Sequence, residues 1–207
     1  MREPRKTSPI RQIAATELPT RWGVFRALGF ERWRPGQRSS ETALVLVLGD
    51  PSLRAPLVRI HSQCITGEVL RSLRCDCGEQ LELAMGAIAA EGSGLLIYEQ
   101  QEGRGIGLMA KLQAYALQDE GLDTIAANHA LGFEADCRDF MLPAAILDHL
   151  GIRELRLLSN NPDKCCALAK AGIAVVEQIP CEAPPSSYST AYLGIKKHRM
   201  GHTLTLI

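Results

Sequence analysis

Three cysteines lie close together in the sequence, at Cys64, Cys75 and Cys77, with the spacing C-x10-C-x-C. Zinc binds thiolates well, and catalytic zinc sites have three protein ligands and a fourth position that stays open. No fourth cysteine lies nearby, but His61 precedes Cys64 by three residues and would complete a closed, structural site. The spacing therefore predicts a metal site. From the residues alone, its role is either to activate water or to hold a loop.

The cysteine content as a whole favours metal binding over disulfides. The chain has 7 cysteines, an odd number, and its first residues, MREPRKTSPIRQ, are polar and basic and lack the apolar segment of a signal peptide. Thiols in a reducing compartment bind metal or pack in the core. We therefore expect a cytoplasmic protein.

Length and composition predict one soluble globular domain. The 207 residues suffice for one buried core, and 23 basic residues balance 23 acidic ones, so no net field attracts nucleic acid. Aromatic residues make up 5% of the chain, too few to supply base-stacking surfaces. No apolar run approaches the roughly 20 residues of a membrane-spanning helix. Neither nucleic acid nor a membrane is expected as a partner.

Strand-like and helix-like segments alternate along the chain. Apolar, β-branched runs predict strands, and apolar residues at helical spacing predict helices. The predicted strands are 43–48, 56–61, 94–98, 154–158 and 173–179. The predicted helices are 81–89, 107–120, 140–150 and 162–171.

This alternation is typical of an α/β domain. We expect a single domain with a mixed sheet, antiparallel in its N-terminal strands and built from parallel βα units toward the C-terminus. The first two predicted strands are joined by the turn-forming GDPS and resemble a hairpin. The domain is expected to span 15–180, between a flexible N-terminal segment, 1–14, and a mobile, Pro/Ser-rich tail, 181–207.

Three further segments could bind an anion. EQQEGRGIGL, at 99–108, joins a strand to a helix, where glycines and free N–H groups suit a phosphate and Arg104 would clamp its oxygens. SNNPDK, at 159–164, offers a hydroxyl and a lysine before another helix, but it also reads as an ordinary helix cap. Asp136 and Arg138 join a proton-accepting carboxylate to a phosphate-binding guanidinium, or form a surface ion pair. Chemistry alone leaves these alternatives open.

The order of these segments resembles the GTP cyclohydrolase II family over residues 15–204. Eight motifs match that family's in the same order: RIHSQCITG, RCDCG, QEGRGIGL, AYALQDEGLDT, NHALGF, ADCRDF, LLSNNPDK and MGHTL. The resemblance implies a zinc-dependent catalytic domain at 15–180 that opens the imidazole ring of GTP and releases formate and pyrophosphate. The implied product is a phosphoribosylamino-pyrimidinone, made in the first step of riboflavin biosynthesis. One Zn²⁺ per subunit, Mg²⁺ on the triphosphate and a homodimer are also implied.

The resemblance assigns roles to individual residues. Asp136 corresponds to the proton acceptor, and Tyr115 to a tyrosine needed to complete the ring chemistry. Arg138 corresponds to a nucleophile toward the α-phosphate; because the pKa of arginine exceeds about 12, a transition-state clamp is the alternative role. The implied zinc ligands are Cys64, Cys75 and Cys77. The implied nucleotide contacts are Arg59, Ile60, His61, Ser62, Gln63, Gln80, Glu102, Gly103, Arg104, Thr124, Ser159 and Lys164.

Three positions differ from the family pattern. Gln63 stands where the family usually has Glu, beside the first implied ligand, and Cys137 stands where Glu is common. Ser159 replaces the usual Thr and keeps the hydroxyl. A lost carboxylate near zinc could alter water activation, so the alternative functions are a paralogue with altered nucleotide chemistry and a non-catalytic nucleotide sensor. A zinc nucleobase deaminase is disfavoured, because the chain lacks the H-x-E and P-C-x-x-C motifs.

Overall fold

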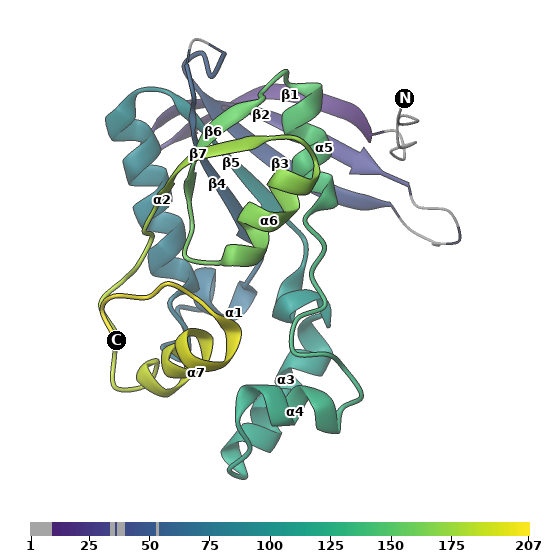
Figure 1. The fold of residues 1–207 in the computed structure, drawn as a ribbon, viewed down its shortest axis with the longest axis vertical. Helices are drawn as coiled ribbons and strands as arrows, with labels where there is room; N and C mark the ends of the chain where they lie inside the picture. The colour runs from purple at the N-terminus through teal and green to yellow at the C-terminus, as the bar shows by residue number, and fades with distance from the viewer. Residues whose placement is uncertain (1–9, 34–35, 37–39, 53) are drawn as a thin grey trace.

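The computed structural model describes residues 10–33, 36, 40–52 and 54–207. In this part of the chain seven strands form one sheet in the order β1-β2-β3-β5-β4-β6-β7 (Figure 1). The strands are β1 (Ile10–Thr20), β2 (Gly23–Arg32), β3 (Glu41–Leu48), β4 (Leu57–Ser62), β5 (Gly94–Glu99), β6 (Glu154–Leu158) and β7 (Ala174–Ile179). Strands β1, β2, β3 and β5 pair antiparallel, whereas β5, β4, β6 and β7 pair in parallel. The predicted α/β fold with a mixed sheet is confirmed.

The hairpin expected between the first two predicted strands does not form. These strands are β3 and β4, and β5 lies between them, antiparallel to β3 and parallel to β4. The physical reason is burial. Five of the six residues of β4 are buried, so both of its faces need cover and both of its edges need partners. A central position between β5 and β6 supplies these, and a terminal hairpin would not.

Helices cover both faces of the sheet (Figure 1). On one face α2 packs through Ala84, Met85 and Ile88, and on the other α5 and α6 pack through residues such as Ile146 and Leu168. The helical segments are α1 (Ile65–Glu68), α2 (Cys77–Glu91), the 3-10 turn η1 (Glu102–Gly105), α3 (Leu108–Asp119), α4 (Thr124–Ala130), α5 (Met141–His149), α6 (Pro162–Lys170) and α7 (Thr190–Met200). No helix among the described residues is both long and apolar enough to cross a membrane.

Local sequence explains where two of these helices begin and where one ends. In α6, Pro162 occupies the first turn, where its missing N–H costs nothing, and the Asn161 side chain accepts a hydrogen bond from the Asp163 amide at 2.9 Å. In α4, the Asp123 carboxylate accepts from two amides of the first turn. Helix α2 is followed by the C-cap residue Gly92, whose φ of 74° favours glycine.

The two terminal segments contain elements that the sequence analysis did not predict. Helix α7 lies within 181–207, and Cys181, Leu193 and Leu204 of this segment are buried. Strand β1 begins at Ile10, inside the segment 1–14, of which residues 1–9 lie outside the described part of the chain. The flexibility and mobility expected for these segments, and the bounds 15–180, stay predictions.

Truncation of Ile97 tests the central position of β5. Ile97 is fully buried and pairs with Ile60 of β4 and Val45 of β3. Ile97→Ala is expected to lower the free energy of unfolding by about 2–5 kcal/mol, because it leaves a cavity, and Ile97→Val by only about 0.5–1.5 kcal/mol. Urea denaturation followed by circular dichroism measures both. Equal, small losses for the two variants would contradict the central position.

Candidate active site

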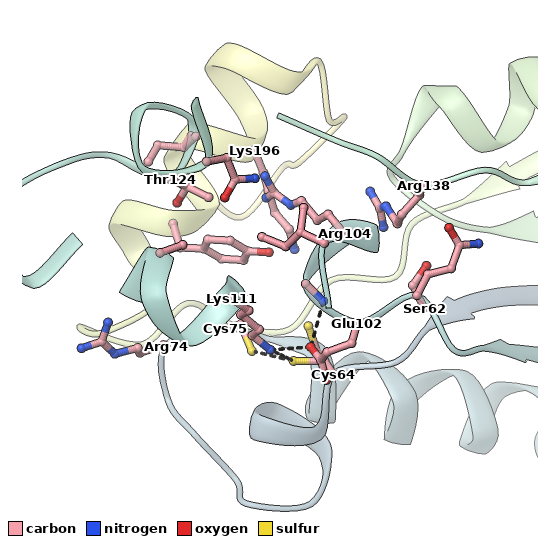
Figure 2. Close-up of a pocket in the computed structure, with 18 of the residues that line it drawn as sticks. Ser62, Cys64, Arg74, Cys75, Glu102, Arg104, Lys111, Thr124, Arg138 and Lys196 are labelled. Carbon is pink, nitrogen blue, oxygen red and sulfur yellow. Dashed lines mark hydrogen bonds and ion pairs between the residues drawn. The ribbon is translucent and has the colours of Figure 1, made fainter. Parts of the chain in front are cut away.

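A cavity of about 610 Å³ lies where β4, β5 and β6 end (Figure 2). After β4 the chain turns to α2 on one face of the sheet, and after β5 it leads through η1 and α3 to α5 on the other. Ligands of α/β proteins bind at such a switch point, outside the carboxyl ends of parallel strands. The candidates that line the cavity are Arg59, His61, Ser62, Gln63, Cys64, Cys75, Cys77, Gln80, Glu102, Gly103, Arg104, Tyr115, Thr124, Arg138, Ser159 and Lys164.

Two candidates do not line this cavity. Ile60 is fully buried in the core, and what it offers the site is its carbonyl, which accepts a hydrogen bond from the Lys164 Nζ at 2.7 Å. The Asp136 carboxylate binds Arg138, with 2.9 Å between Oδ1 and Nε and 2.5 Å between Oδ2 and Nη2. Asp136 therefore lies one side chain behind the cavity wall.

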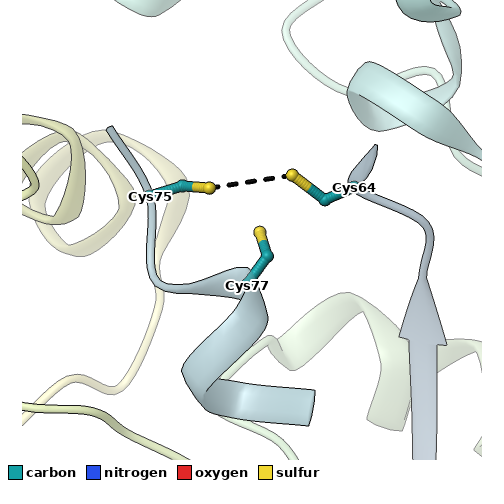
Figure 3. Close-up of side chains that lie close together, drawn as sticks. All are labelled: Cys64, Cys75 and Cys77. Atoms are coloured by element: carbon teal, nitrogen blue, oxygen red, sulfur yellow. Dashed lines mark hydrogen bonds between the residues drawn. The ribbon is translucent and has the colours of Figure 1, made fainter. Parts of the chain in front are cut away.

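The three cysteines come together as one group (Figure 3). Cys64 follows β4, and Cys75 and Cys77 lie at the start of α2, where the helix dipole favours thiolates. Their sulfur atoms all lie within 4.8 Å of one another, and 3.7 Å separates Sγ of Cys64 from Sγ of Cys75. Three soft donors at this spacing could hold a metal ion such as zinc.

His61 does not join this group. Its Nε2 lies 2.9 Å from Oε1 of Glu68, and its Nδ1 faces the Arg59 Nε at 3.4 Å. Because Arg59 can only donate, Nδ1 accepts and the hydrogen is on Nε2, so His61 is neutral. Among the described residues the cysteine group thus has three ligands and no fourth, which argues against the closed structural site.

Hydrogen bonds within the group shift the pKa values of its thiols. Hydrogen bonds from Cys75 and Cys77 lower the pKa of Cys64 well below its usual range. The same bond to Cys64 raises the pKa of Cys75 to about 11. Lys111 Nζ is 3.1 Å from the Cys64 sulfur, and its positive charge also lowers the pKa of that thiol.

Cations such as Arg104, Arg138 and Lys196 line the side of the cavity that lies opposite the cysteine group (Figure 2). The Arg104 Nη1 and Nη2 atoms are buried and have no hydrogen-bond partner among the described residues. Gly103 and Arg104 both have φ near 60°, and for Arg104 this left-handed backbone is strained. Burial, together with Arg59 and Arg138, lowers the pKa of Lys164 well below its usual range. An anionic ligand would satisfy these donors and restore the lysine's charge.

His202 adds an uncharged side chain to the same wall. Burial, followed by the charges of Lys196, Arg138 and Arg104, lowers the pKa of His202 to about 3, so it is neutral at physiological pH. A further positive charge beside these cations would be too costly.

A chain of hydrogen bonds crosses the floor of the cavity. Arg59 Nη2 donates to Gln80 Oε1 at 2.6 Å, and Gln80 Nε2 donates to Asp76 Oδ2 at 2.5 Å. Asp76 Oδ1 accepts from Lys196 Nζ of α7 at 2.9 Å. This chain fixes the orientation of the Gln80 amide and joins β4, α2 and α7.

Comparison with known proteins agrees with this geometry. The family model described as GTP cyclohydrolase II matches residues 11–180. The chain belongs to the GTP cyclohydrolase II family. The predicted family is thereby confirmed.

Curated members of this family resemble the chain over almost its whole length. Proteins named GTP cyclohydrolase-2 from Shigella boydii serotype 18 and from Escherichia coli O9:H4 are each 50% identical over 196 residues, which is 94% of this chain and 98% of theirs. Among solved structures, RibBX, a two-domain 3,4-dihydroxy-2-butanone 4-phosphate synthase from A. baumannii, aligns with a TM-score of 0.47 and 21% identity over 86% of this chain and 41% of its own. A likeness at that level supports no statement about function.

The structure shows the surroundings of the three residues that differ from the family pattern. Gln63 lines the cavity, and its backbone N–H donates to the Glu99 backbone carbonyl at 2.8 Å. Cys137 is exposed and lies outside the three-cysteine group, so it gives no fourth thiolate. Ser159 is buried, and its hydroxyl accepts from the Asn161 amide at 3.1 Å.

Sequence reasoning missed three residues of this site. Lys111, Lys196 and His202 all line the cavity. Burial disfavours the charged form of Lys111, but the hydrogen bond to Glu102 raises its pKa, so it stays an ammonium. One signal was present: Lys111 and Tyr115 are four residues apart and therefore share a face of α3. His202 lies in the family motif MGHTL, but that motif assigned it no role, and Lys196 gave no comparable signal.

Gly67 provides a steric test of the cysteine group. A Cβ at Gly67 would lie 2.8 Å from the Cys75 Sγ and 3.3 Å from the Cys64 Sγ, so Gly67→Ala must displace a sulfur. The expected result is less than half the bound zinc per chain of the parent, measured by elemental analysis after dialysis. In the control, Gly86→Ala, the nearest atom lies 3.9 Å away, and full zinc content is expected. Full zinc content in Gly67→Ala would contradict the geometry.

His61 predicts a pH dependence of stability. Burial lowers the pKa of His61 to about 4 in the folded protein, against about 6.5 in the unfolded chain. Between these values the unfolded chain binds the extra proton, so stability is full above pH 6.5 and falls toward pH 4, by at most about 1.4 kcal/mol per unit. His61→Asn should show a flatter fall in urea unfolding free energy between pH 7 and pH 5. The exposed His129→Asn control should keep the parent slope. Parallel slopes for parent and His61→Asn would refute the assignment.

Proposed function

We propose that this chain hydrolyses GTP to formate, pyrophosphate and a phosphoribosylamino-pyrimidinone, the reaction that begins riboflavin biosynthesis. One observation carries the proposal: a single cavity contains both a three-thiol group and a cluster of cations, among which the buried guanidinium nitrogens of Arg104 have no hydrogen-bond partner among the described residues. The first suits removal of the imidazole carbon, and the second suits departure of pyrophosphate. Membership of the family and relatives named GTP cyclohydrolase-2 support the same activity.

We assign the metal to the three cysteines. Cys64, Cys75 and Cys77 would hold one Zn²⁺ and leave a coordination position free. When bound, zinc lowers the pKa of a water molecule and supplies hydroxide at neutral pH. The chain's own residues must then orient the guanine ring and move protons.

Tyr115 and Asp136 are proposed for the proton steps. Burial raises the pKa of Tyr115 to about 12, so its hydroxyl stays protonated and can donate a hydrogen bond beside the cysteine group. Burial alone would raise the pKa of Asp136, but hydrogen bonds from Arg138 outweigh it and lower the pKa. Asp136 is therefore a carboxylate at neutral pH and can accept a proton.

Arg138 is proposed as an electrostatic clamp on the phosphates. Burial disfavours its charge, but the bonds to Asp136 raise its pKa further, so the guanidinium has no free electron pair with which to attack phosphorus. Arg104, Lys164 and Lys196 add to the field that would stabilise the departing pyrophosphate. Mg²⁺ on the triphosphate would share this task.

The guanine base is proposed to bind at the end of β4. Gln80 lines this part of the cavity and is held by Arg59 and Asp76, so its remaining amide hydrogen and lone pair point in fixed directions. Fixed donors and acceptors discriminate between bases, because a wrong base leaves buried polar groups unpaired. Homodimer formation and a cytoplasmic location belong to the same proposal.

A paired assay tests the activity. The zinc-loaded protein with Mg²⁺ and GTP should release formate and pyrophosphate in equal amounts. Cys75→Ser removes one of three thiolates and should abolish formate release, whereas Cys166→Ser, at an exposed cysteine outside the group, should match the parent. Tyr115→Phe should lower formate release at least tenfold and keep pyrophosphate release, because only the ring chemistry needs the hydroxyl.

The outcomes separate the alternatives. Pyrophosphate without formate in the parent would favour a paralogue that has kept only the phosphate chemistry. Nucleotide binding with neither product would favour a sensor. Full formate release by Cys75→Ser would refute the metal assignment, and equal loss of both products in Tyr115→Phe would refute the role of that tyrosine.

A further inference from the structure

Lys111 makes a contact that neither the resemblance nor the proposed mechanism uses. It lies in the first turns of α3 and is 8% exposed. Its Nζ lies 3.1 Å from the Cys64 Sγ, 2.8 Å from the Thr66 Oγ1 and 2.8 Å from the Glu102 Oε1 (Figure 2). A lysine ammonium has three hydrogens, so each is engaged and the group cannot rotate away.

Glu102 holds the ammonium in place. The carboxylate is itself buried and accepts from the Ile65 amide at 2.7 Å and from the Gly103 amide at 2.9 Å. These bonds tie Glu102 to both the loop that carries Cys64 and the turn that carries Arg104. The position of Lys111 is therefore set by backbone on two sides of the cavity.

The contact between Lys111 and Cys64 matters because it places a positive charge beside a thiolate that would bind the metal. Three thiolates and a divalent cation carry a net charge of about −1, and electron donation from thiolates makes a metal a weaker Lewis acid. A charged hydrogen-bond donor on a ligand sulfur withdraws part of that electron density, and such outer contacts tune a metal's properties. Among the described residues, Lys111 is the one cation that donates a hydrogen bond directly to a cysteine of the group.

We propose that Lys111 is a positioning residue that tunes the metal site: its ammonium donates to the Cys64 sulfur, reduces the charge that this ligand gives to the metal, and so strengthens the metal as a Lewis acid. The inference rests on the proposed metal-dependent function. In this role Lys111 contacts Cys64, a proposed metal ligand, and does not contact the substrate.

Cobalt spectroscopy tests the inference apart from catalysis. Co²⁺ bound to thiolates shows sulfur-to-metal charge-transfer bands in the near ultraviolet. Lys111→Met has a similar length and no charge, so its bands should move to longer wavelength than the parent's. Glu102→Gln leaves the ammonium without its carboxylate partner, so its bands should move to shorter wavelength. Lys111→Arg keeps the charge and should lie closer to the parent than Lys111→Met.

Activity gives the second readout. Formate release by zinc-loaded Lys111→Met should fall about 10–100-fold in kcat, the usual effect of losing an outer contact to a metal ligand, with little change in KM for GTP. The control is Lys170→Met, which removes an exposed lysine of α6 and should change neither bands nor activity.

Failure of this inference differs from failure of the proposed function. Absence of thiolate bands in the cobalt-loaded parent would refute the metal site itself. Normal bands in the parent with unshifted bands in Lys111→Met would overturn only the role of Lys111. If Lys111→Met does not bind cobalt, Glu102→Gln decides: a shift to shorter wavelength supports the inference, and an unshifted spectrum overturns it.

Discussion

Parallel pairing of β4 with both neighbours is the constraint on which the site depends. Because β5, β4 and β6 run in the same direction, the segments that follow them all leave the sheet at one edge. Cys64 follows the first of these strands in the chain, the η1 turn follows the second, and Ser159 follows the third. A hairpin between β3 and β4 would have left β4 with an open edge, away from the segments that complete the site.

Burial of charge then determines the character of the cavity. Lysines and arginines are seldom buried without partners, because desolvation costs more than a single contact returns. Here Lys111 and Lys196 are each compensated by a carboxylate, Glu102 and Asp76 respectively. Among the described residues, the Arg104 guanidinium nitrogens have no hydrogen-bond partner, and Lys164 donates to the Ile60 carbonyl and is influenced by the charge of Glu99. Arg104 and Lys164 thus mark where a polyanionic ligand would bind, and Lys111 and Lys196 hold the protein's own groups in position.

Sequence reasoning succeeded where the decisive contacts are local. Strand 154–158 was predicted at the bounds that the structure gives, and the helices near 107–120 and 162–171 were predicted to within one residue, because their apolar spacing and capping residues are contiguous. The family motifs led to the cysteine group and to most of the cavity wall for the same reason.

Prediction failed where a partner is distant in the sequence. Lys111 binds a sulfur 47 residues away, and Lys196 binds a carboxylate 120 residues away. No local pattern encodes such pairs. The insertion of β5 between β3 and β4 was missed for a related reason, since a short turn suggests a hairpin and only the burial of both faces of β4 overrides it.

Asp76 connects the cysteine group to the last helix, α7. It stands between two cysteines of the group, and its carboxylate is the anchor for Lys196 of α7. Displacement of either cysteine must move that anchor, and release of α7 must leave a buried carboxylate without its cation. Linkage between two such events is reciprocal. The docking of the last helix and the assembly of the cysteine group are therefore thermodynamically coupled. A change that weakens one of them must also weaken the other.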